Sequence, residues 1–86
     1  MDIVAELPIE NGNRIVLLDH QNSYGISNLM RLDQQNDVVW KAELVDQEPY
    51  TGMRIEDGIV RAYSYGGWSV DIDIRIGRMV RKTFVK

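Results

Sequence analysis

A chain of 86 residues has room for one domain with one modest core, and its 44% hydrophobic and 27% charged residues are typical of a globular protein. The absence of cysteine excludes disulfides, thiolate zinc sites and cysteine nucleophiles. No apolar run reaches the roughly 20 residues that a membrane span needs, and the first residues lack the pattern of a signal peptide, so we predict a cytoplasmic protein without membrane contact.

The net charge of −3 is distributed unevenly along the chain. Residues 1–57 carry 11 acidic and 4 basic side chains, a balance of −7, whereas residues 58–86 carry 2 acidic and 6 basic ones, a balance of +4. A pI near 5.0 argues against nucleic acid as the main partner, because binding to phosphates needs a basic excess. We interpret the basic residues near the C-terminus as charges on a solvated last strand.

Four strands are predicted in the first half, at residues 2–7, 13–19, 27–33 and 37–44. The fourth strand shows the clearest alternation, since every second residue from Val38 to Leu44 is apolar and includes Trp40. The second strand instead contains an unbroken apolar run at residues 15–18 between polar turns. Such a run is typical of a strand that is covered on both faces.

Four more strands are predicted in the second half, at residues 52–56, 59–64, 68–74 and 78–85. The third of these has the strictest period of two in the chain, because Val70 and Ile72 alternate with polar residues such as Asp71. We therefore predict that Val70 and Ile72 are buried together with Ile15 and Trp40 of the first half, and that Asp71 points to the opposite face.

Turn residues separate the predicted strands. Asn11-Gly12 and Asp57-Gly58 supply the positive φ angles of tight hairpins, and Gly67 and Gly77 serve the later turns. No segment shows the caps and periodicity of a helix of about ten residues or more. The sequence therefore predicts an all-β fold.

The two halves repeat one another. Ile9-Glu10-Asn11-Gly12 matches Ile55-Glu56-Asp57-Gly58 at an offset of 46 residues, and Leu32-Asp33 matches Ile72-Asp73 at an offset of 40. Repeats of about 40 residues with four short strands are typical of propeller blades. We therefore predict one domain, residues 1–86, built from two four-stranded antiparallel meanders at about 1–45 and 46–86. These would form two blade-like units or, alternatively, a small β-sandwich.

Both halves also resemble a known repeat, and the residues that carry the resemblance are clearest in the second half. Ala62-Tyr63, Val70-Asp71-Ile72-Asp73 and Gly77 are similar to a blade of the quinoprotein-like (PQQ-type) β-propeller, in which aliphatic residues lead to an Asp and then to Thr-Gly. Asp73 and Gly77 keep that spacing, whereas Ile76 replaces the Thr. The resemblance implies a blade-like shape. It does not imply quinone binding, because the residues that hold that cofactor in a closed ring are missing, and we predict no cofactor.

Few residues suggest catalysis or metal binding. Asp71 and Asp73 could hold a hard cation, but an outward polar row opposite buried aliphatic residues explains them better. Asp73 would also accept hydrogen bonds from the backbone of the following turn. His20 and Asp19 are adjacent and would point to opposite faces of a continuing strand. We therefore predict no catalytic residues, no metal ligands and no enzymatic activity.

The residues most suited to binding are aromatic and basic. Tyr65 and Trp68 flank the Gly66-Gly67 turn, where exposed rings would stack on a sugar or anchor a protein, and Tyr24 lies in the long loop of the first half. The alternative for Trp68 is a cross-strand pair with Tyr63. Arg78 and Arg81 begin the last strand, either as part of a binding patch or as charges that block edge pairing.

These observations favour a non-enzymatic role. Two blades cannot close a ring, so the end strands would pair with a second copy or the sheets would pack face to face. We therefore expect a protein partner, a homo-oligomer or both, and a small acidic protein of this type would suit the inhibition of a basic partner, as immunity proteins inhibit toxins. The alternative is a small-ligand or glycan-binding module that uses the loop aromatics.

Overall fold

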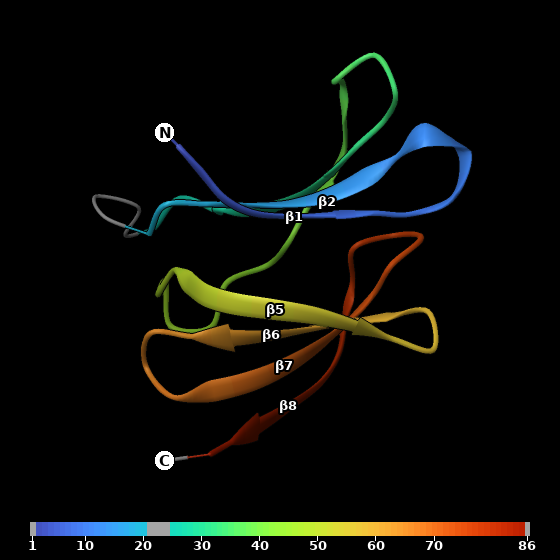
Figure 1. Cartoon of the computed structure of the whole chain (residues 1–86). Coiled ribbons are helices and arrows are strands. Elements are labelled where there is room, and N and C mark those ends of the chain that lie inside the picture. The colour runs from blue at the N-terminus through green and yellow to red at the C-terminus, as the bar shows by residue number, and fades with distance from the viewer. Residues whose placement is uncertain (1, 21–24, 86) are drawn as a thin grey trace.

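The computed structural model describes residues 2–20 and 25–85. Two four-stranded antiparallel sheets lie one above the other (Figure 1). The first sheet contains β1 (Ile3–Pro8), β2 (Arg14–Leu18), β3 (Leu29–Leu32) and β4 (Val38–Lys41), and the second contains β5 (Tyr50–Glu56), β6 (Ile59–Ser64), β7 (Trp68–Asp73) and β8 (Met79–Phe84). Both sheets keep the sequence order of their strands, so the all-β fold of two four-stranded meanders is confirmed.

The predicted strands all exist, with small shifts at their ends. β4 ends at Lys41 rather than at residue 44, because the chain there leaves the first sheet to cross to the second. β5 begins at Tyr50, two residues before the predicted start. A 3₁₀ turn at Glu10–Gly12 joins β1 to β2. No helix in the described residues is long and apolar enough to cross a membrane.

The matching hairpin turns of the two halves have matching backbone conformations. Asn11 and Gly12 have φ angles of 60° and 74°, and Asp57 and Gly58 have φ angles of 50° and 76°. Asn, Asp and Gly tolerate this left-handed region better than other residues. The repeat in the sequence therefore corresponds to a repeat in the local structure.

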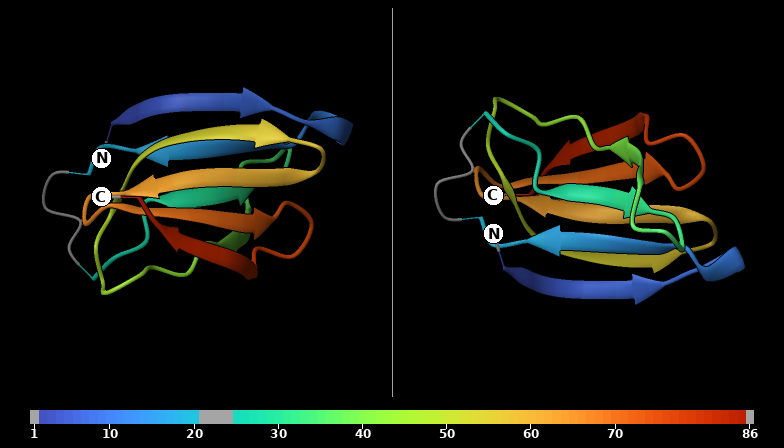
Figure 2. Two further views of the ribbon diagram at one scale, coloured as in Figure 1. Left: turned by 90° about the horizontal axis from the view of Figure 1, so that it is seen from below. Right: turned by 90° about the horizontal axis from the view of Figure 1, so that it is seen from above.

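The two sheets share one hydrophobic core. Eleven buried residues from both sheets and from the connection between them form it: Ile15, Leu17, Leu29, Trp40, Ala42, Val45, Tyr50, Val60, Ala62, Val70 and Ile72. The core includes all four residues that the sequence predicts to be buried. The views along the stacking direction show the strands of one sheet lying over those of the other and running along nearly the same line (Figure 2). The chain is thus a two-layer sandwich with open sheets, in agreement with the alternative form of the fold prediction.

Buried polar groups tie the two layers together. The Asn28 side chain, on the first sheet's side, donates to the Tyr50 carbonyl (2.8 Å) and accepts from the Tyr50 N–H (2.9 Å). At another point of the interface the Trp40 indole and the Arg31 guanidinium both donate to the Ile74 carbonyl, each at 2.9 Å. Buried polar groups are stabilising only when they are paired, so these bonds fix the relative position of the sheets.

The sandwich leaves four strand edges open. β1 and β4 are the outer strands of the first sheet, and β5 and β8 are those of the second. β8 is the most exposed of these strands, with exposed side chains at every position after Met79. Arg81, the candidate binding residue that lies within β8, is therefore at an open edge.

Candidate functional site

Two of the aromatic candidates, Tyr65 and Trp68, lie at the same end of the second sheet but have different ring partners. Tyr65, at the tip of the β6–β7 hairpin, is 62% exposed, and its ring centroid lies 6.0 Å from that of His20. Trp68 begins β7 and is half-buried. Tyr24 lies outside the described residues.

The ring partner of Trp68 differs from the expected one. In the β6–β7 register Tyr63 lies opposite Ser69, so it does not pair with Trp68 across the hairpin. Trp68 instead lies opposite Phe84 of β8, with ring centroids 5.1 Å apart in an edge-to-face arrangement. Lys82 Nζ lies 5.0 Å from the Trp68 ring, within the range of a cation–π contact. Trp68 therefore pairs with Phe84 of β8, and not with Tyr63 of β6.

The basic candidates occupy different positions. Arg78 is an exposed residue of the turn before β8, and its carbonyl accepts the Asp73 N–H. Arg81 lies in β8 opposite Asp71, whereas Lys82 lies opposite the buried Val70. Neighbouring strand residues point to opposite faces, so Arg81 lies on the outer face of the sheet and Lys82 on the face that carries Trp68.

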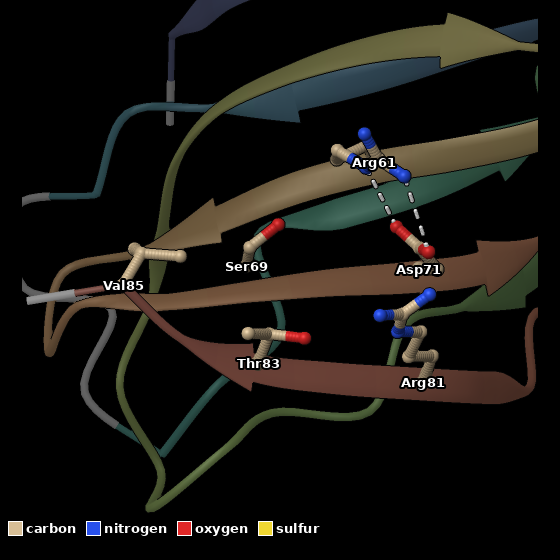
Figure 3. A pocket seen from close by; sticks show the side chains of 6 residues that line it. All are labelled: Arg61, Ser69, Asp71, Arg81, Thr83 and Val85. Atoms are coloured by element: carbon tan, nitrogen blue, oxygen red, sulfur yellow. Dashed lines mark hydrogen bonds and ion pairs between the residues drawn. The ribbon is translucent and has the colours of Figure 1, made fainter.

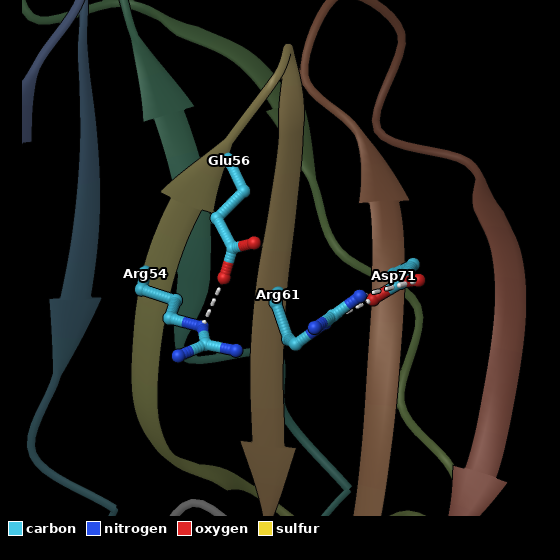
Figure 4. A network of polar contacts seen from close by, with 4 residues as sticks. All are labelled: Arg54, Glu56, Arg61 and Asp71. Carbon is cyan, nitrogen blue, oxygen red and sulfur yellow. Dashed lines mark hydrogen bonds and ion pairs between the residues drawn. The ribbon is translucent and has the colours of Figure 1, made fainter.

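A row of charged residues crosses the outer face of the second sheet. The register places Arg54, Arg61, Asp71 and Arg81 opposite one another on β5 to β8. Arg61 donates to both carboxylate oxygens of Asp71, at 2.8 and 3.4 Å, and Arg54 pairs with Glu56 at 2.7 Å (Figure 4). The Arg81 side chain has no hydrogen-bond or ion-pair partner among the residues that the structure describes.

A hollow lies beside this row on the outer face. It has a volume of about 210 Å³ and is lined by Arg61, Ser69, Asp71, Arg81, Thr83 and Val85. Figure 3 shows Arg61 and Arg81 on either side of Asp71, with the Ser69 and Thr83 hydroxyls toward the other end. Of the predicted binding residues that the structure describes, only Arg81 lines this hollow.

The charges around Asp71 hold it ionised. The hydrogen bond from Arg61 is the main reason why the Asp71 pKa lies below its usual range, and burial opposes this effect. The positive charges of Arg61, Arg81 and Arg54 lower the same pKa further. The carboxylate is therefore an anion that already occupies a site between two guanidinium groups.

The other acidic residues that suggested chemistry have structural roles. Asp73 Oδ1 accepts the Arg75 N–H at 2.8 Å, which confirms the predicted turn-capping role. Asp33, its match in the first half, accepts the N–H groups of Gln35 and Asp37 in the same way. In the described part of the chain, no group of three or more His, Cys, Asp or Glu side chains is placed to hold a metal ion.

The sequence analysis missed four of the residues that line this hollow: Ser69, Thr83, Val85 and, with the strongest contact, Arg61. Arg61 lies in the weaker β6 pattern, and its side chain becomes relevant only through its partner on β7. The alternation of Val60, Arg61 and Ala62 does place Arg61 on the polar face. The sequence pattern therefore indicated on which face Arg61 lies, but its pairing with Asp71 follows only from the strand register.

Comparison with known proteins identifies a family but not an activity. Neither the curated proteins nor the solved structures contain a match to this chain. Nothing in the comparisons indicates the quinoprotein-like repeat that the two halves resemble. The model of one family, described as Domain of unknown function (DUF7957), matches residues 2–84. Because this match extends over nearly all of the 86 residues, the chain belongs to the DUF7957 family.

Proposed function

We propose that this chain is a non-enzymatic protein-binding module that pairs an extended segment of another chain with the open edge of β8. The observation that carries the proposal is the composition of this edge. Val80, Phe84 and Val85 are 57%, 54% and 59% exposed on or next to a strand that has a neighbour on one side only. An exposed, partly apolar edge strand is a template for strand addition.

The chemistry of the edge specifies the segment that would bind. Arg81 and Lys82 add positive charge to the apolar residues of β8, on opposite faces of the strand. An incoming strand would place its side chains beside these residues on each face. The segment that fits is therefore extended, apolar and acidic.

A second copy of the chain offers such a segment. β1 is an edge strand of the first sheet, it carries the exposed residues Ile3 and Val4, and it includes Glu6. Pairing of β8 with β8 would instead bring like charges together, which is destabilising. Self-association would therefore join unlike edges of two copies, head to tail.

Light scattering tests this proposal at micromolar concentration and moderate salt. We expect a mass of twice 9.9 kDa or more for the native chain, and a single-chain mass for Val80→Lys, because a lysine on an edge strand discourages pairing. Val39→Lys is the matched control, since Val39 is a similarly exposed residue of β4, the edge strand of the other sheet. An equal effect of both variants would contradict the assignment to β8.

A single-chain mass for the native protein would exclude a second copy as the occupant of the edge. A synthetic peptide with the sequence of residues 2–8 then tests the edge itself. We expect it to bind the native chain and not Val80→Lys, whereas a peptide with both acids changed to lysine should bind neither. Failure of the acidic peptide as well would overturn the proposal.

Two other predictions from the sequence concern different surfaces. Inhibition of a basic partner would use the acidic first half rather than β8. A glycan-binding role would depend mainly on Tyr65, because the Trp68 ring already contacts Phe84 and Lys82. Both stay predictions, and the edge proposal depends on neither of them.

A further inference from the structure

The hollow on the outer face of β6, β7 and β8 has the groups of an anion-binding site, and it shares Arg81 and Val85 with the β8 edge. It opens on the face opposite to Trp68 and brings together side chains from three strands. Its volume of about 210 Å³ is enough for a small organic molecule.

The charges around the hollow do not cancel. Arg61 is matched by Asp71, with a shortest N–O distance of 2.8 Å, and the neighbouring Arg54 is matched by Glu56 at 2.7 Å. Arg81 has no such partner in the described ranges. One positive charge therefore remains, on a guanidinium that lines the hollow.

Hydrogen-bond donors without partners in the described residues line the hollow. A guanidinium presents N–H groups in a planar fork that matches the two oxygens of a carboxylate. Ser69 and Thr83 lie opposite each other in the register of β7 and β8, and both hydroxyls border the hollow. Neither hydroxyl is hydrogen-bonded within the part of the chain that the structure describes. The hollow thus offers the guanidinium N–H groups of Arg81 and the hydroxyls of Ser69 and Thr83 as hydrogen-bond donors.

We propose that this hollow binds the carboxylate of a small organic acid. Arg81 binds the two oxygens as a fork, the hydroxyls of Ser69 and Thr83 donate to the same group, and Val85 contacts the apolar part of the ligand. A singly charged anion fits better than a phosphate dianion, because one positive charge is in excess and the Asp71 carboxylate repels a second negative charge. This proposal does not rest on pairing at the β8 edge.

The first test is an NMR titration of the ¹⁵N-labelled chain with acetate, isobutyrate and inorganic phosphate at constant ionic strength, with chloride as the reference. We expect shifts concentrated at Ser69, Asp71, Arg81 and Thr83. Isobutyrate should bind more tightly than acetate because its methyl groups contact Val85, and phosphate should bind most weakly. Shifts identical to those with chloride, or tightest binding by phosphate, would overturn the proposal.

Two substitutions on β8 separate a site from a general effect of charge. Arg81→Gln removes the fork and should weaken isobutyrate binding by about tenfold or more, since a hydrogen bond to a charged group is lost. Lys82→Gln removes the same charge one residue away, on the other face, and should weaken binding less than about twofold. Equal losses in both variants would show that only net charge matters, and would overturn the proposal.

Asp71→Asn tests the charge of the hollow by removing its negative group rather than a positive one. The amide keeps the shape of the side chain but removes the anion that competes for the two guanidinium groups. We expect tighter binding of isobutyrate and, above all, of phosphate. Unchanged or weaker binding of both ions would contradict the assigned charge balance, and the spectrum of each variant shows whether it is folded.

Discussion

At the residue scale, Asn28 shows how one buried side chain holds two layers together. It is fully buried, and its amide donates to the carbonyl groups of Leu18 and Tyr50 while its oxygen accepts the Tyr50 N–H. A buried polar group without partners costs free energy, so three hydrogen bonds make this position favourable only in the native arrangement. Asn28 therefore specifies where the chain enters the second sheet.

Gly77 gives the first prediction at this scale. Its φ angle is +78°, and a Cβ atom at this position would lie 2.6 Å from the Trp40 ring. We expect Gly77→Ala to lower the free energy of unfolding by about 2 to 5 kcal/mol, from backbone strain and overpacking together. Urea denaturation measures the loss.

Gly58 is the matched control for this prediction. Its φ angle of +76° is nearly the same, but an added Cβ would have no atom within 4 Å. Gly58→Ala should therefore lower the free energy of unfolding by only about 1 to 2 kcal/mol, from backbone strain alone. Equal losses for the two variants would show that contact with Trp40 is unimportant.

Tyr50 gives a prediction about pH. Burial of its side chain, with a smaller effect from the charge of Glu43, raises its pKa from 10.0 to about 12. Between these values the unfolded chain loses the phenol proton while the native chain keeps it. The Tyr50 contribution to stability is therefore complete below pH 10 and is lost as the pH rises through about 12.

The Tyr50→Phe variant isolates this effect. Its loss of the hydrogen bond to the Glu43 carbonyl should cost about 0.5 to 1.5 kcal/mol at neutral pH. Above pH 10 the free energy of unfolding of the unsubstituted protein should fall faster with pH than that of Tyr50→Phe. Urea denaturation at several pH values measures both. Parallel curves for the two proteins would contradict the raised pKa.

At the element scale, the alternation along β7 decides which residues stabilise the sandwich. Ile72 is fully buried in the shared core, whereas Asp71 lies on the outer face and pairs with Arg61. We expect Ile72→Ala to cost about 2 to 5 kcal/mol in the free energy of unfolding, because it leaves a cavity. Asp71→Ala should cost at most about 1 kcal/mol, as a partly exposed ion pair does. Reversed costs in urea denaturation would exclude this register.

Local patterns explain why the strands could be predicted from the sequence. A period of two, unbroken apolar runs and the Asn-Gly and Asp-Gly turns depend on neighbours in the chain, so all eight strands and the core positions of Ile15 and Ile72 followed from them. The repeat added the division into two sheets of four strands.

Contacts between strands could not be predicted in the same way. The partner of Trp68 depends on the β7–β8 register, which shifts between Asp71 and Ile72, and such an irregularity leaves no clear mark in one sequence. The same register brings Arg81 beside Asp71 and Arg61. The sequence therefore identified Arg81 as a candidate but placed it in no site.

At the scale of the whole molecule, both outer faces of the sandwich carry charged residues. On the first sheet Glu6 lies opposite Val16 and Lys41 lies opposite Met30, and Val16 and Met30 are themselves buried. The outer face of the second sheet carries the row from Arg54 to Arg81. Stacking of successive copies face to face would bury charged groups, which is costly. Association at the strand edges avoids this cost.

The shared core leads to the last prediction, that the two sheets unfold together. Neither sheet covers its own inner face, and the bonds from Trp40 and Arg31 to Ile74 cross between the layers. A sheet with an uncovered apolar face is unstable in water. We therefore expect one cooperative transition rather than separate unfolding of the two halves.

The two tryptophans allow a direct measurement, because Trp40 lies in the first sheet and Trp68 in the second. Trp68→Phe leaves a fluorescence reporter in the first sheet, and Trp40→Phe leaves one in the second. In each variant the fluorescence transition in urea should coincide with the circular dichroism transition of the whole chain, even though Trp40→Phe also loses the bond to Ile74 and should be less stable by about 1 kcal/mol. If one sheet were an independent unit, its tryptophan would report a midpoint that differs from the transition of the remaining β structure.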